Sequence, residues 1–222
     1  MAIRTYHPRR GRLSGRHRDA LDRLLPVYGV TETTPAVRLD AATLFGRDVP
    51  LVLEIGSGMG EATAAMAAAD PERGYLAAEI HTPGVANLLA VTEERGLTNV
   101  RVAPLDALDL LRDRIAPESL AAVHVFFPDP WPKARHHKRR LIQPAHVALV
   151  SSRLAPGGVL HCATDWAEYA SWMLETLTAS DLVNAHDGFA PRPASRPWTK
   201  FELRGVSAER PVFDLVFRKV GP

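Results

Sequence analysis

The sequence predicts an α/β protein with a doubly wound, mostly parallel sheet in a single domain. From residue 51 onward, short apolar runs alternate with segments of helical pattern, which is typical of βαβ units. The chain has 222 residues, of which 46% are hydrophobic, enough to bury one substantial core. No repeat, low-complexity tract or linker divides it. We therefore expect a domain over residues 46–222, preceded by a basic, partly ordered extension over residues 1–45.

The first half of the predicted sheet alternates three strands with two helices. The run LVLEI, residues 51–55, is predicted to be the first buried strand, and the helix-forming residues 60–69 follow a glycine-rich turn. The run GYLAAEI, residues 74–80, is predicted as the second strand. A helix opened by proline spans residues 83–95, and the third strand spans residues 99–105.

The second half continues the alternation. LAAVHVFF, residues 120–127, is apolar enough to lie at the sheet centre. A helix over residues 142–153 ends before a turn made by one proline and two glycines, which leads into a fifth strand within residues 155–164. An amphipathic helix over residues 165–179 follows, and residues 211–219 form the last predicted strand.

One long segment interrupts this regular pattern. Residues 186–210 are rich in proline, arginine and polar side chains and carry no clear periodicity. Long loops in compact domains are usually functional or disordered.

Positive charge is concentrated in two parts of the chain. Residues 1–23 hold seven arginines against two aspartates, and residues 133–140 hold five cations and no acid, so each carries +5. Because the whole chain has a net charge of +2, the remainder carries −8. This distribution indicates one basic face for a polyanion. A flexible tail and a solvated loop are the alternative, equally open for the first segment and disfavoured for the second by its neighbouring aromatic residues and acid.

Cysteine content and hydropathy limit the class of protein. The single cysteine, Cys162, excludes an intrachain disulfide and any CxxC pair, which suits a reducing compartment, so we expect a cytoplasmic protein. No apolar stretch is long enough to span a bilayer, and the N-terminus lacks the apolar core of a signal peptide, so we expect neither anchoring nor export. His136 and His137 have no acid or cysteine at ligand spacing, so no metal is expected.

Three glycines, Gly56, Gly58 and Gly60, lie between the first strand and the following helix. Glycine lets the backbone approach a ligand closely, and the helix start offers free N–H groups. The dinucleotide fingerprint needs its third glycine one position later, where Glu61 stands. An acid there disfavours a pyrophosphate and is better tolerated by S-adenosylmethionine. A tight structural turn without a ligand is the alternative.

Three acids follow three successive predicted strands. Glu79 ends the second strand, roughly 20 residues beyond the glycine turn, where an acid can accept both ribose hydroxyl hydrogens of an adenosine. Asp106 and Asp129 lie just past the third and fourth strands. Each acid singly is better explained as a helix cap or a solvated residue. Together they favour a cofactor site, because the carboxyl ends of parallel strands share one edge of the sheet.

These features resemble the class I S-adenosylmethionine-dependent methyltransferases. The run FPDPWPKARHHKRRL, residues 127–141, is similar to the hallmark of the bacterial tRNA (guanine-N7-)-methyltransferase family. The similarity extends to LEIGSGMG, AAEIH, ATDWAEYA, RPWTKFELRG and the arginine-rich start RTYHPRRGRLSGRH. Pro128 stands where many members carry a small residue and Leu105 where glycine is common, but neither departure removes a functional side chain.

The resemblance implies a Rossmann-like fold and methyl transfer from S-adenosylmethionine to N7 of the variable-loop guanosine, tRNA position 46. Asp129 is the implied catalytic residue. With the glycine turn, the predicted cofactor contacts are Glu54, Gly56, Gly58, Glu79, Asp106 and Asp129. The predicted tRNA contacts, including the basic run that would attract phosphates, are Lys133, Arg135, Lys138, Arg139, Arg140, Asp165, Thr199, Lys200, Phe201 and Glu202.

The residue types suit this chemistry. Guanine N7 has a free lone pair and no proton to lose, so methyl transfer needs alignment more than a strong base. An ionised carboxylate can position the base and offset the positive charge on the methylated ring. The prolines around Asp129 would restrict its backbone, although a purely structural turn explains them too. Trp131 could stack on an extruded base or simply pack the loop against the core.

Two other functions stay open at this point. A non-catalytic RNA-binding module could keep the fold without the chemistry, and it is disfavoured because every acid the mechanism needs is present. An NAD-dependent enzyme is disfavoured by Glu61. The resemblance to the bacterial family implies a monomer or a loose homodimer. Buried positions are expected for Cys162 and for the aromatic residues Trp166, Tyr169 and Trp172.

Overall fold

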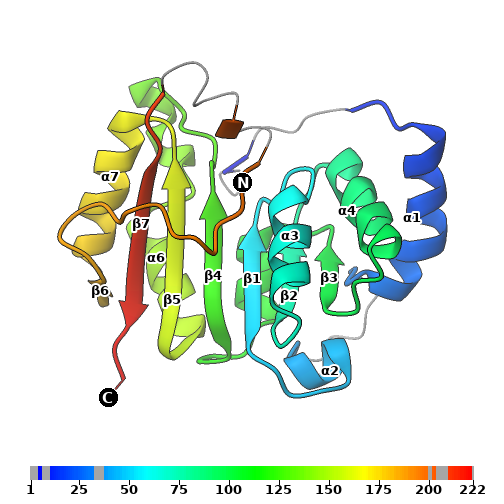
Figure 1. The fold of residues 1–222 in the computed structure, drawn as a ribbon. Helices are drawn as coiled ribbons and strands as arrows, with labels where there is room; N and C mark the ends of the chain where they lie inside the picture. The colour runs from blue at the N-terminus through cyan, green and yellow to red at the C-terminus, as the bar shows by residue number, and fades with distance from the viewer. Residues whose placement is uncertain (1–4, 7–10, 33–37, 200–201, 204–209, 222) are drawn as a thin grey trace.

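A seven-stranded sheet forms the centre of the computed structural model, which describes residues 5–6, 11–32, 38–199, 202–203 and 210–221 (Figure 1). The strand order is β3-β2-β1-β4-β5-β7-β6. The strands are β1 (Leu51–Ile55), β2 (Gly74–Ala78), β3 (Val100–Ala103), β4 (Leu120–Phe126), β5 (Leu154–Thr164), β6 (Leu182–Asn184) and β7 (Phe213–Lys219).

The first five strands are parallel to one another, and only β7 and β6 run antiparallel to their neighbours. The chain builds outward from β1 through β2 to β3, then returns to the other side of β1 for β4 and β5. This reversal between β1 and β4 is where open α/β sheets bind ligands. The predicted doubly wound, mostly parallel sheet is confirmed. Strand β6 was not predicted, because three residues of mixed burial carry no pattern.

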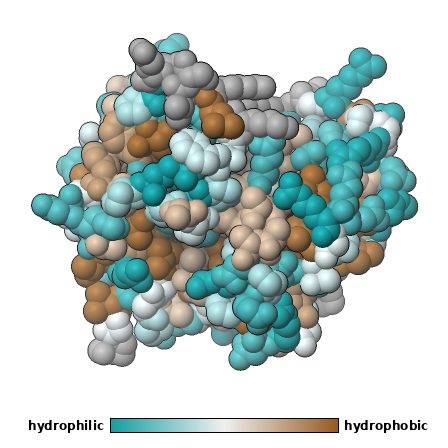
Figure 2. Space-filling view, viewed as in Figure 1, coloured by the Kyte–Doolittle hydropathy of each residue, from teal (hydrophilic) through white to brown (hydrophobic). Residues whose placement is uncertain are grey.

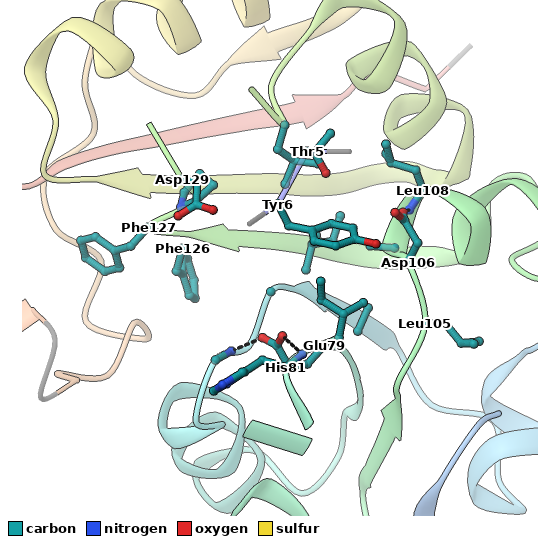
Figure 3. Close-up of a pocket in the computed structure, with 18 residues that line it drawn as sticks. Thr5, Tyr6, Glu79, His81, Leu105, Asp106, Leu108, Phe126, Phe127 and Asp129 are labelled. Carbon is teal, nitrogen blue, oxygen red and sulfur yellow. Dashed lines mark hydrogen bonds between the residues drawn. The ribbon is translucent and has the colours of Figure 1, made fainter. Parts of the chain in front are cut away.

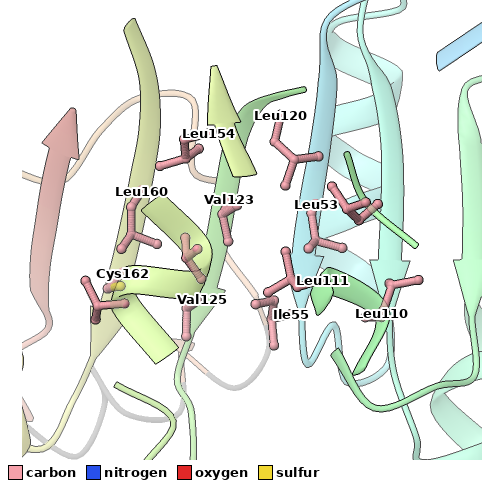
Figure 4. Packing of buried hydrophobic residues seen from close by; sticks show 14 of the residues in the cluster. Leu53, Ile55, Leu110, Leu111, Leu120, Val123, Val125, Leu154, Leu160 and Cys162 are labelled. Atoms are coloured by element: carbon pink, nitrogen blue, oxygen red, sulfur yellow. The ribbon is translucent and has the colours of Figure 1, made fainter. Parts of the chain in front are cut away.

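Helices cover both faces of the sheet, as the buried side chains show. On one face, α1, α3 and α4 pack over the side chains of β1, β2 and β3; on the other, α5, α6 and α7 pack over β1, β4 and β5. Figure 4 shows part of the second cluster, in which Leu53, Val123 and Leu160 lie on neighbouring strands. The helices are α1 (Gly15–Tyr28), α2 (Ala41–Phe45), α3 (Glu61–Ala69), α4 (Thr82–Glu94), α5 (Ala107–Asp113), α6 (Pro144–Arg153) and α7 (Ala167–Thr178).

Helix α1 packs against α4. Ser14 caps its start by accepting the backbone N–H of His17 at 3.2 Å, and Ala20 and Leu24 are its buried side chains. Ion pairs on the outer side join it to α4, and Figure 2 shows mainly hydrophilic residues over these two helices. The sequence did not predict α1, because only two buried positions stand among many charges. The domain boundary expected at residue 45 stays a prediction.

The irregular segment beginning at residue 186 crosses the front of β7, β5 and β4 (Figure 1). Among the described residues, no helix covers this part of the front face in Figure 1, so the loop takes that place. Cys162 is fully buried, as expected, and so is Tyr169. Trp172 is partly buried against the core, whereas the prediction for Trp166 was wrong: its side chain is 41% exposed, because it precedes α7 rather than lying on its buried face. None of the described helices is long and apolar enough to cross a membrane.

Candidate active site

The backbone of the glycine-rich turn after β1 is accessible to a ligand. Gly56 has φ of 74° and Gly58 φ of 57°, a left-handed conformation that side-chain-bearing residues rarely adopt. A Cβ atom at either position would meet nothing within 4 Å, so these glycines border free space. Gly60 serves a different purpose, because a Cβ there would lie 2.6 Å from the Cβ of Leu88. Its role is the close packing of α3 on α4.

Glu79 holds this turn in place. Its two carboxylate oxygens accept the backbone N–H groups of Gly58 and His81, each at 2.7 Å, as the dashed lines in Figure 3 mark. Hydrogen bonds to a carboxylate are about twice as strong as neutral ones, and Glu79 is only 7% exposed. The carboxylate is therefore fixed between the end of β2 and the glycine turn.

A pocket of about 460 Å³ opens at the carboxyl edge of the sheet, next to the glycine turn. This volume is typical of small-molecule sites. Glu79, Asp106 and Asp129 all line it, so the topology brings together the three acids that the sequence placed at three strand ends (Figure 3). Asp106 also caps α5 by accepting the backbone N–H of Leu108 at 2.8 Å. Their contacts with a ligand stay a prediction.

The loop that carries Asp129 is tightly constrained. Phe127 and Trp131, on either side of Asp129, have φ of 53° and 45°, unusual for residues with bulky side chains. Trp131 is 8% exposed, and its indole N–H donates to the backbone oxygen of Thr5 at 3.2 Å. In this structure Trp131 therefore packs the loop, the second of the two alternatives left open by the sequence.

The N-terminal segment contributes to the same pocket. Thr5 and Tyr6 line it, although they lie more than a hundred residues from Asp129 in sequence. The guanidinium of Arg139 stacks 3.7 Å above the Trp131 ring and donates to the backbone oxygen of Tyr6 at 3.3 Å. No local pattern in the sequence indicates this contact, so Thr5 and Tyr6 were not predicted to line the pocket.

The basic run lies around a short 3-10 helix, η1 (Ala134–Arg139). Lys133, Arg135 and Lys138 are exposed, as a phosphate contact requires. The prediction for Arg140 needs correction. Its side chain is 0% exposed, its Nε donates to the backbone oxygen of Pro130 at 3.0 Å, and its terminal nitrogens bind both carboxylate oxygens of Glu168. A guanidinium so enclosed cannot reach a phosphate, so Arg140 fixes the Asp129 loop to α7.

The remaining predicted tRNA contacts lie near the long loop. Asp165 follows β5, with the guanidinium of Arg210 2.8 Å from its carboxylate. Thr199 accepts the backbone N–H of Glu202 at 3.1 Å. Glu202 is 1% exposed and forms ion pairs with Arg192 and Arg196, so its carboxylate faces the interior rather than a substrate. Lys200 and Phe201 lie outside the described residues.

Glu54, the first predicted cofactor contact, lies behind the pocket wall. It is 3% exposed, accepts the hydroxyl of Thr63, and is not among the residues that line the pocket. Burial raises the pKa of Glu54 to about 7. The hydrogen bond from the Thr63 hydroxyl lowers this pKa, but it offsets only part of the rise. Direct contact with a cofactor stays a prediction for this residue.

This raised pKa predicts a pH-dependent stability. Between about pH 4.5 and 7, the unfolded chain has released the Glu54 proton and the folded chain keeps it, so folding stability falls as the pH rises. Glu54→Gln has no carboxyl proton to release, so it removes this loss of folding stability at higher pH. We expect its melting temperature to exceed the wild type's increasingly from pH 5 to pH 7.5, measured by thermal unfolding. A constant difference across this range would contradict the raised pKa, and weakened S-adenosylhomocysteine binding would support a cofactor contact.

The pocket fits S-adenosylmethionine. The open glycine turn gives a ligand access to the backbone, and the hydroxyl oxygen of Ser57, in the same turn, is buried with no hydrogen-bond partner among the described residues. Glu79 supplies a fixed carboxylate, and Glu61 in the first turn of α3 disfavours a pyrophosphate. A doubly wound sheet with this site at its switch point fits a class I S-adenosylmethionine-dependent methyltransferase.

Comparison with known proteins gives the family. The model of the family described as "Putative methyltransferase" matches residues 48–215. A tRNA (guanine-N(7)-)-methyltransferase of Aromatoleum aromaticum is 54% identical, over 99% of this chain and 85% of its own. A protein of the same name in Streptomyces coelicolor is 55% identical, over 98% of this chain and 81% of its own. The chain belongs to the tRNA (guanine-N(7)-)-methyltransferase family.

Two solved structures with a similar fold are methyltransferases. The 16S rRNA methyltransferase KamB has a TM-score of 0.59 and is 15% identical, over 83% of this chain and 95% of its own. An antibiotic-related methyltransferase has a TM-score of 0.60 at 12% identity, over 80% and 92%. At such low identity the likeness concerns the fold alone.

Proposed function

We propose that this protein transfers a methyl group from S-adenosylmethionine to N7 of the variable-loop guanosine at position 46 of tRNA. The observation that carries the proposal is the meeting of Glu79, Asp106 and Asp129 in one pocket, beside an exposed run of cations. The name of the relatives, tRNA (guanine-N(7)-)-methyltransferase, supports the substrate, because they are similar over nearly the whole chain.

The residues that line the pocket have different roles in the proposed reaction. Bound S-adenosylmethionine supplies an electrophilic methyl group on a sulfonium. Glu79 and Asp106 lie at the ends of β2 and β3, where they orient the cofactor through its hydroxyl and amino groups. Asp129 lies at the end of β4, with Phe126 and Phe127 also lining the pocket, and faces the target base.

Asp129 acts by position and charge. N7 of guanine forms the new bond with its own lone pair, the bond from sulfur to methyl breaks, and no proton leaves, so no general base is needed. The ring becomes positively charged as the bond forms. A carboxylate held by the constrained Phe127–Trp131 loop stabilises that charge without having to reorganise.

The exposed cations next to this loop bind the tRNA backbone. Lys133, Arg135 and Lys138 attract phosphates with little dependence on sequence, which brings the variable loop to Asp129. The cytoplasm, where tRNA is modified, is the compartment we propose. A monomer or loose homodimer remains our expectation.

The salt dependence of binding tests this basic surface. The double substitution Arg135→Ala and Lys138→Ala should weaken tRNA binding and reduce the slope of log K against log salt by up to about two. Fluorescence anisotropy with labelled tRNA at several salt concentrations measures both. The exposed ion-paired Arg112→Ala, on α5, is the matched control and should leave the slope unchanged. An unaltered slope in the double variant would remove these residues from the RNA surface.

The reaction itself has a direct test. The purified protein is incubated with unmodified tRNA and methyl-labelled S-adenosylmethionine, and the nucleosides are analysed by mass spectrometry. We expect the label in 7-methylguanosine, and none when the guanosine at position 46 is replaced. Label in another nucleoside would refute the specificity, and no label despite tight tRNA binding would favour a non-catalytic RNA-binding module.

A further inference from the structure

Trp198 is an exposed aromatic residue on the long loop. Its side chain is 54% exposed, whereas tryptophan is highly buried on average. The guanidinium of Arg192 lies 3.8 Å from the centre of its ring, so one face of the indole is covered. An aromatic ring covered on one side and exposed to solvent on the other can receive a planar partner.

Buried charges fix this arrangement. Arg192 donates from Nε and a terminal nitrogen to the two carboxylate oxygens of Glu202, at 3.1 and 3.2 Å. Such a two-pronged contact defines the plane of the guanidinium. Glu202 is itself 1% exposed and also pairs with Arg196 at 2.8 Å. The buried carboxylate therefore orients Arg192, and Arg192 orients the indole of Trp198.

The same network joins the loop to the sheet beside the pocket. Arg196 donates to both carboxylate oxygens of Asp214 on β7, at 2.8 and 2.9 Å. Its guanidinium also lies 5.9 Å from the ring centre of Phe126 and 5.6 Å from that of Phe127, and both rings line the pocket. Trp198, two residues further along the loop, is thus anchored close to the Asp129 loop.

We propose that Trp198 stacks on a nucleobase of the RNA substrate, on a platform formed by Arg192 and positioned by Glu202. The cationic guanidinium beneath the indole and the exposed cations of the basic run suit an anionic, base-bearing partner. This inference rests on the proposed tRNA substrate and assigns to Glu202 a positioning role in place of the predicted substrate contact.

Stacking and phosphate contacts respond differently to salt, which gives a specific test. Trp198→Ala should raise the Kd for tRNA about tenfold, within the range for loss of one base stack, and leave the slope of log K against log salt unchanged. Trp198→Phe keeps an aromatic face and should stay within about threefold of the wild type. The affinity for S-adenosylhomocysteine, measured by calorimetry, should not change in either variant.

Val183→Ala is the matched control, because Val183 is also 54% exposed and lies on the edge strand β6, which pairs with β7. It should bind tRNA as the wild type does. Equal tRNA affinities of wild type and Trp198→Ala would overturn the stacking proposal alone. A reduced salt slope in Trp198→Ala would also overturn it, because the loss would then be one of charge. A wild-type protein that binds no tRNA would overturn the proposed function as well.

Discussion

Asp129→Asn is expected to lower kcat/KM for tRNA methylation by about two orders of magnitude, the scale observed when one preorganised electrostatic group is removed. The amide has nearly the shape of the carboxylate, so the constrained loop from Phe127 to Trp131 should keep its conformation. What disappears is the negative charge that offsets the positive charge of the methylated ring. Single-turnover rates with saturating cofactor and tRNA separate the loss in the chemical step from any loss in tRNA binding.

Two further variants isolate the role of Asp129. Asp109→Asn, on the exposed side of α5 and paired with Arg112, removes a carboxylate outside the pocket and should leave the rate unchanged. Asp129→Glu keeps the charge but displaces it by one methylene group, so we expect an intermediate rate. A wild-type rate in Asp129→Asn, with an unchanged melting temperature, would refute the electrostatic role.

Glu79→Gln should weaken S-adenosylhomocysteine binding by one to two orders of magnitude. Both oxygens of Glu79 accept backbone N–H groups, from Gly58 and His81 at 2.7 Å. A glutamine presents an NH₂ group to one of these donors, so one buried N–H loses its partner, which typically costs 1–3 kcal/mol. The glycine turn loosens at the same time, and the charge available to the ligand is lost. Isothermal titration calorimetry measures the affinity.

The control for Glu79 must separate the site from general stability. Glu94→Gln removes an exposed ion pair with Arg16 between α1 and α4, and it should change neither affinity nor melting temperature appreciably. Glu79→Gln should lower the melting temperature by a few degrees because of the unpaired N–H. Wild-type affinity in Glu79→Gln would show that this carboxylate only supports the turn.

Much of the fold could be predicted from local patterns. Residues 51–55 are apolar without interruption because a central parallel strand is buried on both faces, and the structure buries all five positions of β1. The same regularity predicted that Glu79, Asp106 and Asp129 share one edge, because parallel strands joined by helices end on the same side. Helix α1 and strand β6 escaped prediction, since each has too few buried positions to form a pattern.

The burial of the functional side chains, in contrast, could not be predicted from the sequence. Arg140 and Arg139 are neighbours in one basic run, but Arg140 is fully buried against Glu168, 28 residues away in sequence, whereas Arg139 stacks on Trp131. Glu202 looks in sequence like an available acid, but two arginines of the same loop enclose it. The sequence shows that a charged residue is present, but not whether an oppositely charged side chain pairs with it in the fold.

The sequence by itself determined the sheet apart from β6, its winding and the edge at which the acids meet, because strand and helix periodicity and βαβ handedness are local properties of the chain. Only the tertiary structure decided which charges face solvent, that the N-terminal Thr5 and Tyr6 line the pocket, and that Trp198 is held on Arg192. These features depend on contacts between segments far apart in sequence. Such contacts arise from packing in three dimensions, and no spacing along the chain encodes them.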